Sequence, residues 1–136
     1  MALQRMPLRV DTPTVQTVGD AVASGNLQAL SQRKLNALGL PLAYVDRGFR
    51  YRFANRAFLD WLGRRPEEVI GREIVEVQGR EVWTLYHAYA DAALEGERTG
   101  FERQLATAGR PTIWIRVDYY PDRAATGRVR GFLVTY

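Results

Sequence analysis

Apolar side chains near the N-terminus recur at the spacing of a helix. They lie three to five residues apart within two runs, Val15, Val18 and Val22 and then Leu27, Leu30, Leu35 and Leu38. Gly39 ends the pattern, because glycine readily takes the left-handed conformation that closes a helix. We therefore expect an amphipathic helical segment over residues 15–39. Residues 1–14 show no such period and are expected to form a flexible leader.

From residue 40 onward the pattern changes to short segments that are typical of strands. Residues 42–46 are mostly apolar, and residues 50–55 alternate arginine with aromatic or small side chains. A period of two puts every second side chain on one face of a strand, here Tyr51, Phe53 and Asn55. With a glycine turn between them, the two segments predict a β-hairpin.

The middle of the chain predicts three helical segments. The first covers residues 56–62, the second is a single turn that begins at Pro66, and the third covers residues 80–95. The third carries two neighbouring stripes at helical spacing, one of Val82, Tyr86, Tyr89 and Ala93 and one of Trp83, His87, Ala90 and Leu94. Tyr86 and Tyr89 are expected to face the core more directly than His87.

Three strands are predicted to close the chain, over residues 99–106, 112–120 and 129–136. Glycine and proline mark turns between them at residues 108–111 and 121–127. In the first of these strands, alternation places Phe101, Arg103 and Leu105 on the same face. Two strands, three helices and three strands in this order indicate an α+β fold with an antiparallel sheet rather than parallel βαβ units.

Composition and charge narrow the function classes. The 136 residues suit a single domain. The absence of cysteine excludes disulfides, zinc–thiolate centres, iron–sulfur clusters, cysteine nucleophiles and photochemistry through a cysteine adduct. No apolar run approaches the ~18 residues of a membrane span and the first residues do not resemble a signal peptide, so we expect a cytoplasmic protein without membrane insertion. The net charge of +4 comes from scattered arginines, and no nucleic-acid partner is expected.

The sequence does not predict an enzyme. His87 is its only histidine, and neither a G-x-S-x-G elbow nor a phosphate-binding loop is present. Carboxylates that could be paired for catalysis, such as Asp46 and Asp118, fall at strand ends or on faces that are expected to be solvated. We expect no metal site either.

A series of short motifs runs through the second part of the chain in a characteristic order. They are Tyr44-Val-Asp46, Tyr51-Arg-Phe-Ala-Asn55, Phe58, Trp61-Leu-Gly63, Pro66-Glu-Glu68, Gly71, Ala93-Leu-Glu-Gly-Glu97, Phe101-Glu-Arg103, Trp114, Pro121, Gly127, Val129 and Gly131-Phe132. With these motifs, residues 40–136 resemble a PAS domain, the sensor module of bacterial signalling proteins. The resemblance implies a five-stranded antiparallel sheet in the order 2-1-5-4-3, with short central helices on one face that enclose a small cavity.

The resemblance also implies a regulatory role. PAS domains commonly stand before a histidine kinase of a two-component system, an enzyme of cyclic-di-GMP signalling or a transcription regulator, and they bind a small ligand or pair with a copy of themselves. We expect an output domain in the same chain or in a partner, and a chain that is part of a longer protein. The alternative is a protein-interaction module whose core is filled by its own side chains.

A site for a small organic molecule is expected in the cavity that the resemblance implies. Its candidate residues are Tyr51, Phe53, Asn55, Phe58, Trp61, Tyr86, Tyr89 and Arg103. Aromatic walls with a few polar groups are typical of such sites, and aromatic side chains at the same spacing also fill ordinary cores.

Three polar candidates each have two interpretations. Asn55 either caps the helix that follows it or lines the cavity, and the two roles are compatible. Arg103 either meets a carboxylate or an anionic ligand, or it extends its charged end to water along its apolar stem. His87 would be the axial ligand of a haem, as a histidine from this helix is in some PAS domains, but its spacing from Gly96 differs from theirs. A position on the flank of the helix is the simpler interpretation of His87, so haem is the less favoured cofactor.

Two apolar surfaces have no partner in this scheme. One is the leucine stripe of the N-terminal segment, and the other is the face of the fourth strand that carries Trp114, Arg116 and Tyr120. The simplest account pairs these surfaces, either within one chain or across a homodimer. The candidate residues of a dimer interface are therefore Leu27, Leu30, Leu35, Leu38 and Trp114.

Overall fold

A five-stranded antiparallel sheet forms the centre of the chain. The computed structural model describes residues 10–25 and 40–136, and the strands in these residues lie in the order β2-β1-β5-β4-β3. They are β1 (Leu42–Asp46), β2 (Tyr51–Ala54), β3 (Thr99–Leu105), β4 (Ile113–Arg123) and β5 (Val129–Thr135). This arrangement confirms the α+β fold and the strand order expected from the sequence.

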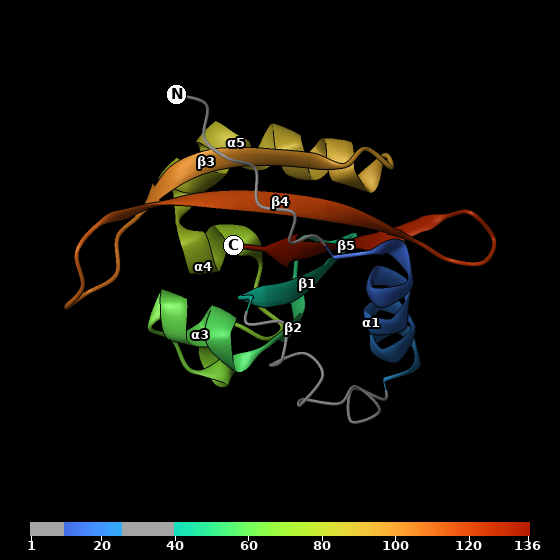
Figure 1. Cartoon of the computed structure of the whole chain (residues 1–136), viewed down its shortest axis with the longest axis horizontal. Coiled ribbons are helices and arrows are strands. Elements are labelled where there is room, and N and C mark those ends of the chain that lie inside the picture. Colours follow the sequence, from blue (N-terminus) through green and yellow to red (C-terminus); the bar gives the residue numbers. More distant parts are fainter. Residues whose placement is uncertain (1–9, 26–39) are drawn as a thin grey trace.

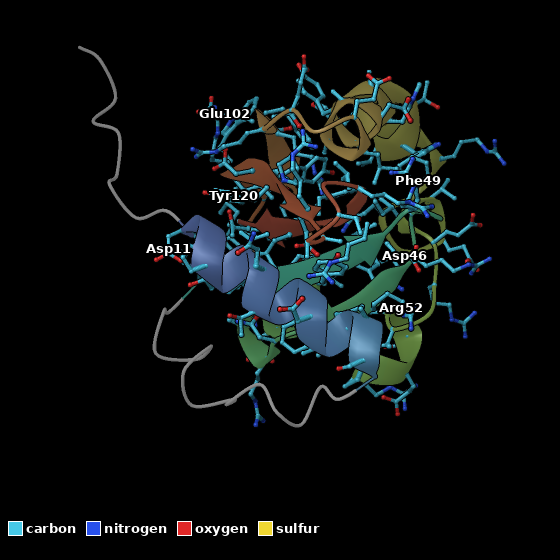
Figure 2. The ribbon with its side chains drawn as sticks, turned by 90° about the vertical axis from the view of Figure 1, so that its right-hand side faces the viewer. Asp11, Asp46, Phe49, Arg52, Glu102 and Tyr120 are labelled. Atoms are coloured by element: carbon cyan, nitrogen blue, oxygen red, sulfur yellow. The ribbon has the colours of Figure 1, made fainter. Side chains whose placement is uncertain are left out.

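Helices cover both faces of the sheet (Figure 1). The segments between β2 and β3 pack on one face, which we call the inner face: α3 (Arg56–Leu62), the 3-10 turn η2 (Pro66–Glu68), α4 (Ile74–Gln78) and α5 (Arg80–Leu94). The opposite, outer face is covered by α1 (Thr12–Ser24), which Figure 2 shows lying across the strands. Each face of the sheet therefore has its own apolar core.

Alternate side chains of the strands build the inner core. In β3 and β4 the alternation follows the sequence prediction, with Phe101, Arg103 and Leu105 buried in one strand and Ile115, Val117 and Tyr119 in the other. Phe58 of α3 and Ala90 and Ala93 of α5 close over them. Burial of each large apolar side chain contributes about 1.5–3 kcal/mol, so this face supplies much of the drive to fold.

A bulge in β2 reverses the alternation between Tyr51 and Phe53. Val45 pairs with Tyr51 and Tyr44 pairs with Phe53, so Arg52 is an extra residue between two pairs. Tyr51 consequently packs in the inner core, whereas Phe53 packs in the outer core beneath α1. The prediction that these two aromatic side chains share a face is wrong, because a strict period of two does not survive a bulge.

β4 also departs from its predicted length. It continues to Arg123 through residues that were expected to form a turn, and it pairs with β5 along this extension. Pro121 is tolerated there because β3 pairs with β4 only as far as Tyr119. Pro121 thus has one neighbouring strand, and an edge position of this kind is where a strand accepts proline.

The first helix begins three residues before the predicted segment. The side chain of Asp11 caps α1 by accepting a hydrogen bond from the backbone N–H of Thr14 (2.8 Å), and Pro13 fits the first turn, where its missing N–H has no intrahelical acceptor. The apolar period is confirmed for Val15 and Val18, which are buried against the sheet. The end of the predicted leader therefore belongs to the helix.

A buried polar cluster fixes α1 to the outer face. Asp122 is completely buried and accepts hydrogen bonds from the Tyr44 hydroxyl (2.6 Å) and from Nε of Arg130 (2.6 Å). Arg130 also donates to Asp20 of α1 (2.6 Å), so its guanidinium joins the helix to the sheet. Gly19 lies directly over the Asp122 carboxylate, and a Cβ at that position would overlap it.

Residues 26–39 lie outside the described residues, so the second half of the predicted helical segment stays a prediction. Among the described helices, none combines the length and the apolar character that crossing a bilayer requires.

Gly19→Ala is expected to lower the free energy of unfolding by about 1–3 kcal/mol, because the new methyl group overlaps the Asp122 carboxylate. Helix propensity alone predicts the opposite, a gain of about 1 kcal/mol. Urea unfolding followed by circular dichroism measures the change, and Ala23→Gly at an exposed position of the same helix calibrates the propensity difference. A Gly19→Ala protein that is at least as stable as the parent would contradict the close packing of α1.

Candidate functional site

A polar network lies at one end of the inner core. Nη2 of Arg103 donates a hydrogen bond to Oε1 of Gln78 (2.7 Å), and Nη1 donates to the backbone carbonyl of Gln104 (2.9 Å). The Gln78 amide then donates to the hydroxyls of Tyr51 and Tyr136, at 3.1 Å each. Side chains from β2, α4 and β3 and from the residue after β5 thus converge on one point.

The two residues that sequence reasoning missed are Gln78 and Tyr136. Gln78 ends α4, a five-residue helix that alternates apolar and polar side chains like a strand and was not predicted. A signal was present, because the backbone N–H of Glu73 donates to the Glu76 side chain (3.0 Å), the acidic residue three positions on that often follows a helix N-cap. Tyr136 could have been found by continuing the period of two from Phe132.

Arg103 sits at the junction of a cavity and a groove. The cavity is small, with a volume of about 20 Å³, which is the space of about one water molecule. The groove is open and measures about 750 Å³. Both are lined by Gln78, Val82, Tyr86 and Arg103, so the polar network forms part of the wall between the inner core and the outside.

The positive charge of Arg103 is not matched by a carboxylate. Arg103 is 7% exposed, and its partners are the neutral side chains of Gln78 and Tyr136 and a backbone carbonyl. All 15 aspartate and glutamate residues fall within residues 10–25 and 40–136, and none of the ion pairs in that part of the chain includes Arg103. The burial of Arg103 that the alternation predicted is therefore confirmed, whereas its partners within the described residues are neutral and include no carboxylate.

Burial also changes the tyrosines that surround the guanidinium. Removal from water raises the pKa of Tyr51 and Tyr136, because the charged phenolate is disfavoured in the core. Burial raises the pKa of Tyr119 for the same reason. The nearby Arg103 charge opposes this rise at each of the three residues. All three hydroxyls therefore stay protonated at neutral pH and can donate hydrogen bonds.

The predicted aromatic residues divide into those that line the cavity and those that support it. Tyr51 and Tyr86 line it, and the Tyr86 ring stacks on Phe101 with centroids 4.3 Å apart. Phe58 is fully buried behind the cavity and contacts the Tyr136 ring, while Trp61 packs at the edge of the same core. These two side chains hold Tyr136 in place and are not among the lining residues.

The other predicted site residues lie away from the cavity. Tyr89 was expected to face the core but is 38% exposed, and its ring packs against Phe101 from the surface. Phe53 belongs to the outer core, as described above. Asn55 is the N-cap of α3, and its side chain is fully used by the backbone: Oδ1 accepts from Phe58 and Leu42, and Nδ2 donates to Leu40. Of its two interpretations, the capping role is the one the contacts support.

His87 does not fit the role of a haem ligand. Its side chain is 47% exposed on the flank of α5, where Nδ1 lies 3.3 Å from Oδ2 of Asp91 and the ring packs beside Trp83. His87 does not line the inner cavity, and a cavity of about 20 Å³ does not admit a porphyrin. Within the described residues, no group of three or more histidine, aspartate or glutamate side chains is placed to hold a metal ion.

The face of β4 that was predicted to pair with the N-terminal segment is only partly covered. α1 and Tyr120 meet in the outer core, whereas Trp114 at the other end of β4 is 70% exposed and lines the groove. The stripe of Leu27, Leu30, Leu35 and Leu38 falls outside the described residues. The dimer interface therefore stays a prediction.

Stability is expected to fall as the pH rises above about 10. Unfolded tyrosines lose their protons near that pH, whereas Tyr51 and Tyr136 in the core keep theirs, so the unfolded state binds fewer protons. Each buried tyrosine then lowers the free energy of unfolding by at most about 1.4 kcal/mol per pH unit. Urea unfolding at several pH values from 8 to 11.5 measures the slope, which Tyr51→Phe should reduce. A free energy that is constant across this range would rule out the protonated tyrosine cluster.

The model of the PAS fold family matches residues 35–136. The PAS domain of BvgS from Bordetella pertussis superposes with a TM-score of 0.63 at 22% identity, covering 76% of this chain and 79% of that one. A light-oxygen-voltage domain studied with a flavin analogue gives 0.61 at 22% identity, covering 76% and 79%.

A third similar structure is the PAS domain of a protein from Colwellia psychrerythraea, with a TM-score of 0.61 at 15% identity, covering 77% of this chain and 94% of that one. At these identities the structures share the fold, and they say nothing about a common ligand. A search of curated protein sequences gave no match. Because the family model covers most of the chain and the sheet has the family's strand order, the chain belongs to the PAS fold family.

Proposed function

We propose that this PAS domain is a cytoplasmic sensor that binds a small organic molecule at the polar end of its inner core. It would regulate an output domain in the same chain or in a partner, such as a histidine kinase, an enzyme of cyclic-di-GMP signalling or a transcription regulator. The observation that carries the proposal is the network of Arg103, Gln78, Tyr51 and Tyr136, which stands between the core and an open groove. A structural core alone does not need a buried charge at such a place.

The network also offers a route for the signal. Gln78 joins Arg103 to the hydroxyl of Tyr136, the residue that follows β5. A ligand that binds the remaining donors of Arg103 lies beside Gln78, and Gln78 in turn holds two tyrosines. If the ligand binds one arrangement of this network better than another, it shifts the population toward that arrangement, by no more than its difference in affinity.

No catalysis and no flavin enter this proposal. The only histidine of the sequence lies on the surface beside Asp91. The light-oxygen-voltage domain among the similar structures was studied with a flavin analogue, but this chain has no cysteine to form an adduct and its inner cavity has room for about one water. A larger ligand has to use the groove as well.

A second candidate function is a protein-interaction module, and two observations favour it. The inner core is nearly filled by its own side chains, with about 20 Å³ of free space. Trp114 and Ile113 expose apolar surface at the start of β4, with 70% and 40% of their surfaces accessible. In this alternative, a homodimer or a partner protein would cover Trp114, and the groove would take no small molecule.

Extraction of the freshly purified protein, followed by mass spectrometry, tests the first proposal. We expect a small organic molecule in a fixed ratio to the chain, and we expect Gln78→Leu to lower that ratio several-fold because the polar end of the site is lost. Gln16→Leu is the matched control, since this side chain is exposed on α1, at the opposite face of the sheet.

Purified protein that carries no small molecule would contradict the sensor proposal. If this protein also forms a dimer that Trp114→Ser abolishes in sedimentation experiments, the interaction module becomes the proposed function. A monomer at high micromolar concentration would contradict the homodimer.

A further inference from the structure

We infer that the ligand of this domain is a carboxylate with an apolar body, whose carboxyl group binds Arg103 while its body lies in the groove beside α5. The inference rests on the proposed function and adds the chemical class of the molecule. It is carried by the charge at the end of the core, by the residues that line the groove and by the donors that Arg103 leaves unused.

Arg103 carries a buried positive charge that has no counter-charge in the described residues. Arg103 is 7% exposed, and a buried guanidinium is expensive to hold among neutral partners, because the lost hydration is repaid only by a counter-charge and by hydrogen bonds. The hydrogen bonds to Gln78 and Gln104 are present, and the counter-charge is missing. Every carboxylate side chain of the sequence lies in the described residues and none of them pairs with Arg103, so a counter-charge would be supplied by another molecule.

The ligand needs only one negative charge at Arg103. The guanidinium is a single positive charge at the closed end of the site, and one carboxylate neutralises it. Its fork has five N–H groups, and the hydrogen bonds to Gln78, to Gln104 and to the Tyr136 hydroxyl use at most three, so two remain for the two oxygens of a carboxylate. Both N–H groups of the Gln78 amide are used by the two tyrosines, whereas the hydroxyls of Tyr51 and Tyr136 keep their own protons as further neutral donors beside the same point.

The groove beside Arg103 has room for the apolar body of the ligand. Its volume of about 750 Å³ is in the range of small-molecule sites, and Arg103 lies in its wall. The apolar part of the wall could hold an aryl or alkyl body, and it consists of Leu62, Val77, Val82, Leu85, Leu105 and Trp114. The charged side chains in the wall are three arginines and one glutamate, namely Arg64, Arg80, Arg103 and Glu81. The groove thus attracts anions and also shelters an apolar group.

Titration calorimetry with two matched probes tests the inference. 4-Phenylbutyrate and 4-phenylbutan-1-ol share one apolar body and differ in the charge of the end group. We expect the acid to bind the parent protein about ten- to a hundredfold more tightly than the alcohol, since a hydrogen-bonded ion pair replaces a neutral contact. In Arg103→Gln the two probes should bind equally, and in Arg103→Lys the acid should keep part of its advantage, because a charge remains without the fork.

Arg56→Gln is the matched control, because it removes the same charge from an exposed position at the start of α3 and should leave the preference for the acid unchanged. Thermal unfolding checks that each variant is folded, and Arg103→Lys carries the test if Arg103→Gln is not. Equal binding of acid and alcohol to the parent protein would overturn the carboxylate assignment and leave the sensor proposal in place. Stronger binding of phenyl phosphate than of phenylbutyrate would overturn it as well, and binding of neither probe together with an empty purified protein would overturn both.

Discussion

A positive charge placed inside an apolar core has to be compensated, and in this PAS domain that requirement falls on Arg103. The sheet turns the side chain inward because β3 alternates regularly, so Arg103 follows Phe101 to the buried face. Gln78 meets the guanidinium from α4 and holds two tyrosine hydroxyls with its amide. The position of α4, the closure of the cavity and the orientation of Tyr136 therefore all depend on how this one charge is satisfied.

The outer face solves the same problem with a full ion pair. Asp122 is buried without any exposure, yet Arg130 and the Tyr44 hydroxyl both donate to it, and Asp20 completes the cluster from α1. The two faces of one sheet thus carry opposite cases, a buried carboxylate with its counter-charge and a buried guanidinium without one. The first suits a fixed attachment of α1. The second suits a site that binds something, because a counter-charge supplied by a ligand adds most where none is present.

Much of this fold could be predicted from the sequence, because regular alternation and helix boundaries depend on neighbouring residues. The strands that flank Arg103 and the helix that begins after Asn55 were predicted for that reason. The errors arose where the local pattern is interrupted or depends on distant partners. A bulge at Arg52 moved Phe53 to the other face, and α4 was too short to show a period. Arg103 was recognised as a buried charge, whereas its partner Gln78 came from the helix that had been missed.

The central claim is that Arg103 is the point at which this domain meets a negatively charged molecule. The most direct measurement is an electron-density map at high resolution, from crystals of protein purified without added ligands. We predict density for a carboxylate against the guanidinium of Arg103, continuous with an apolar body in the groove lined by Val82 and Trp114. A guanidinium that contacts only Gln78, the Gln104 carbonyl, the Tyr136 hydroxyl and water in such a map, in protein shown to be active in signalling, would contradict the account.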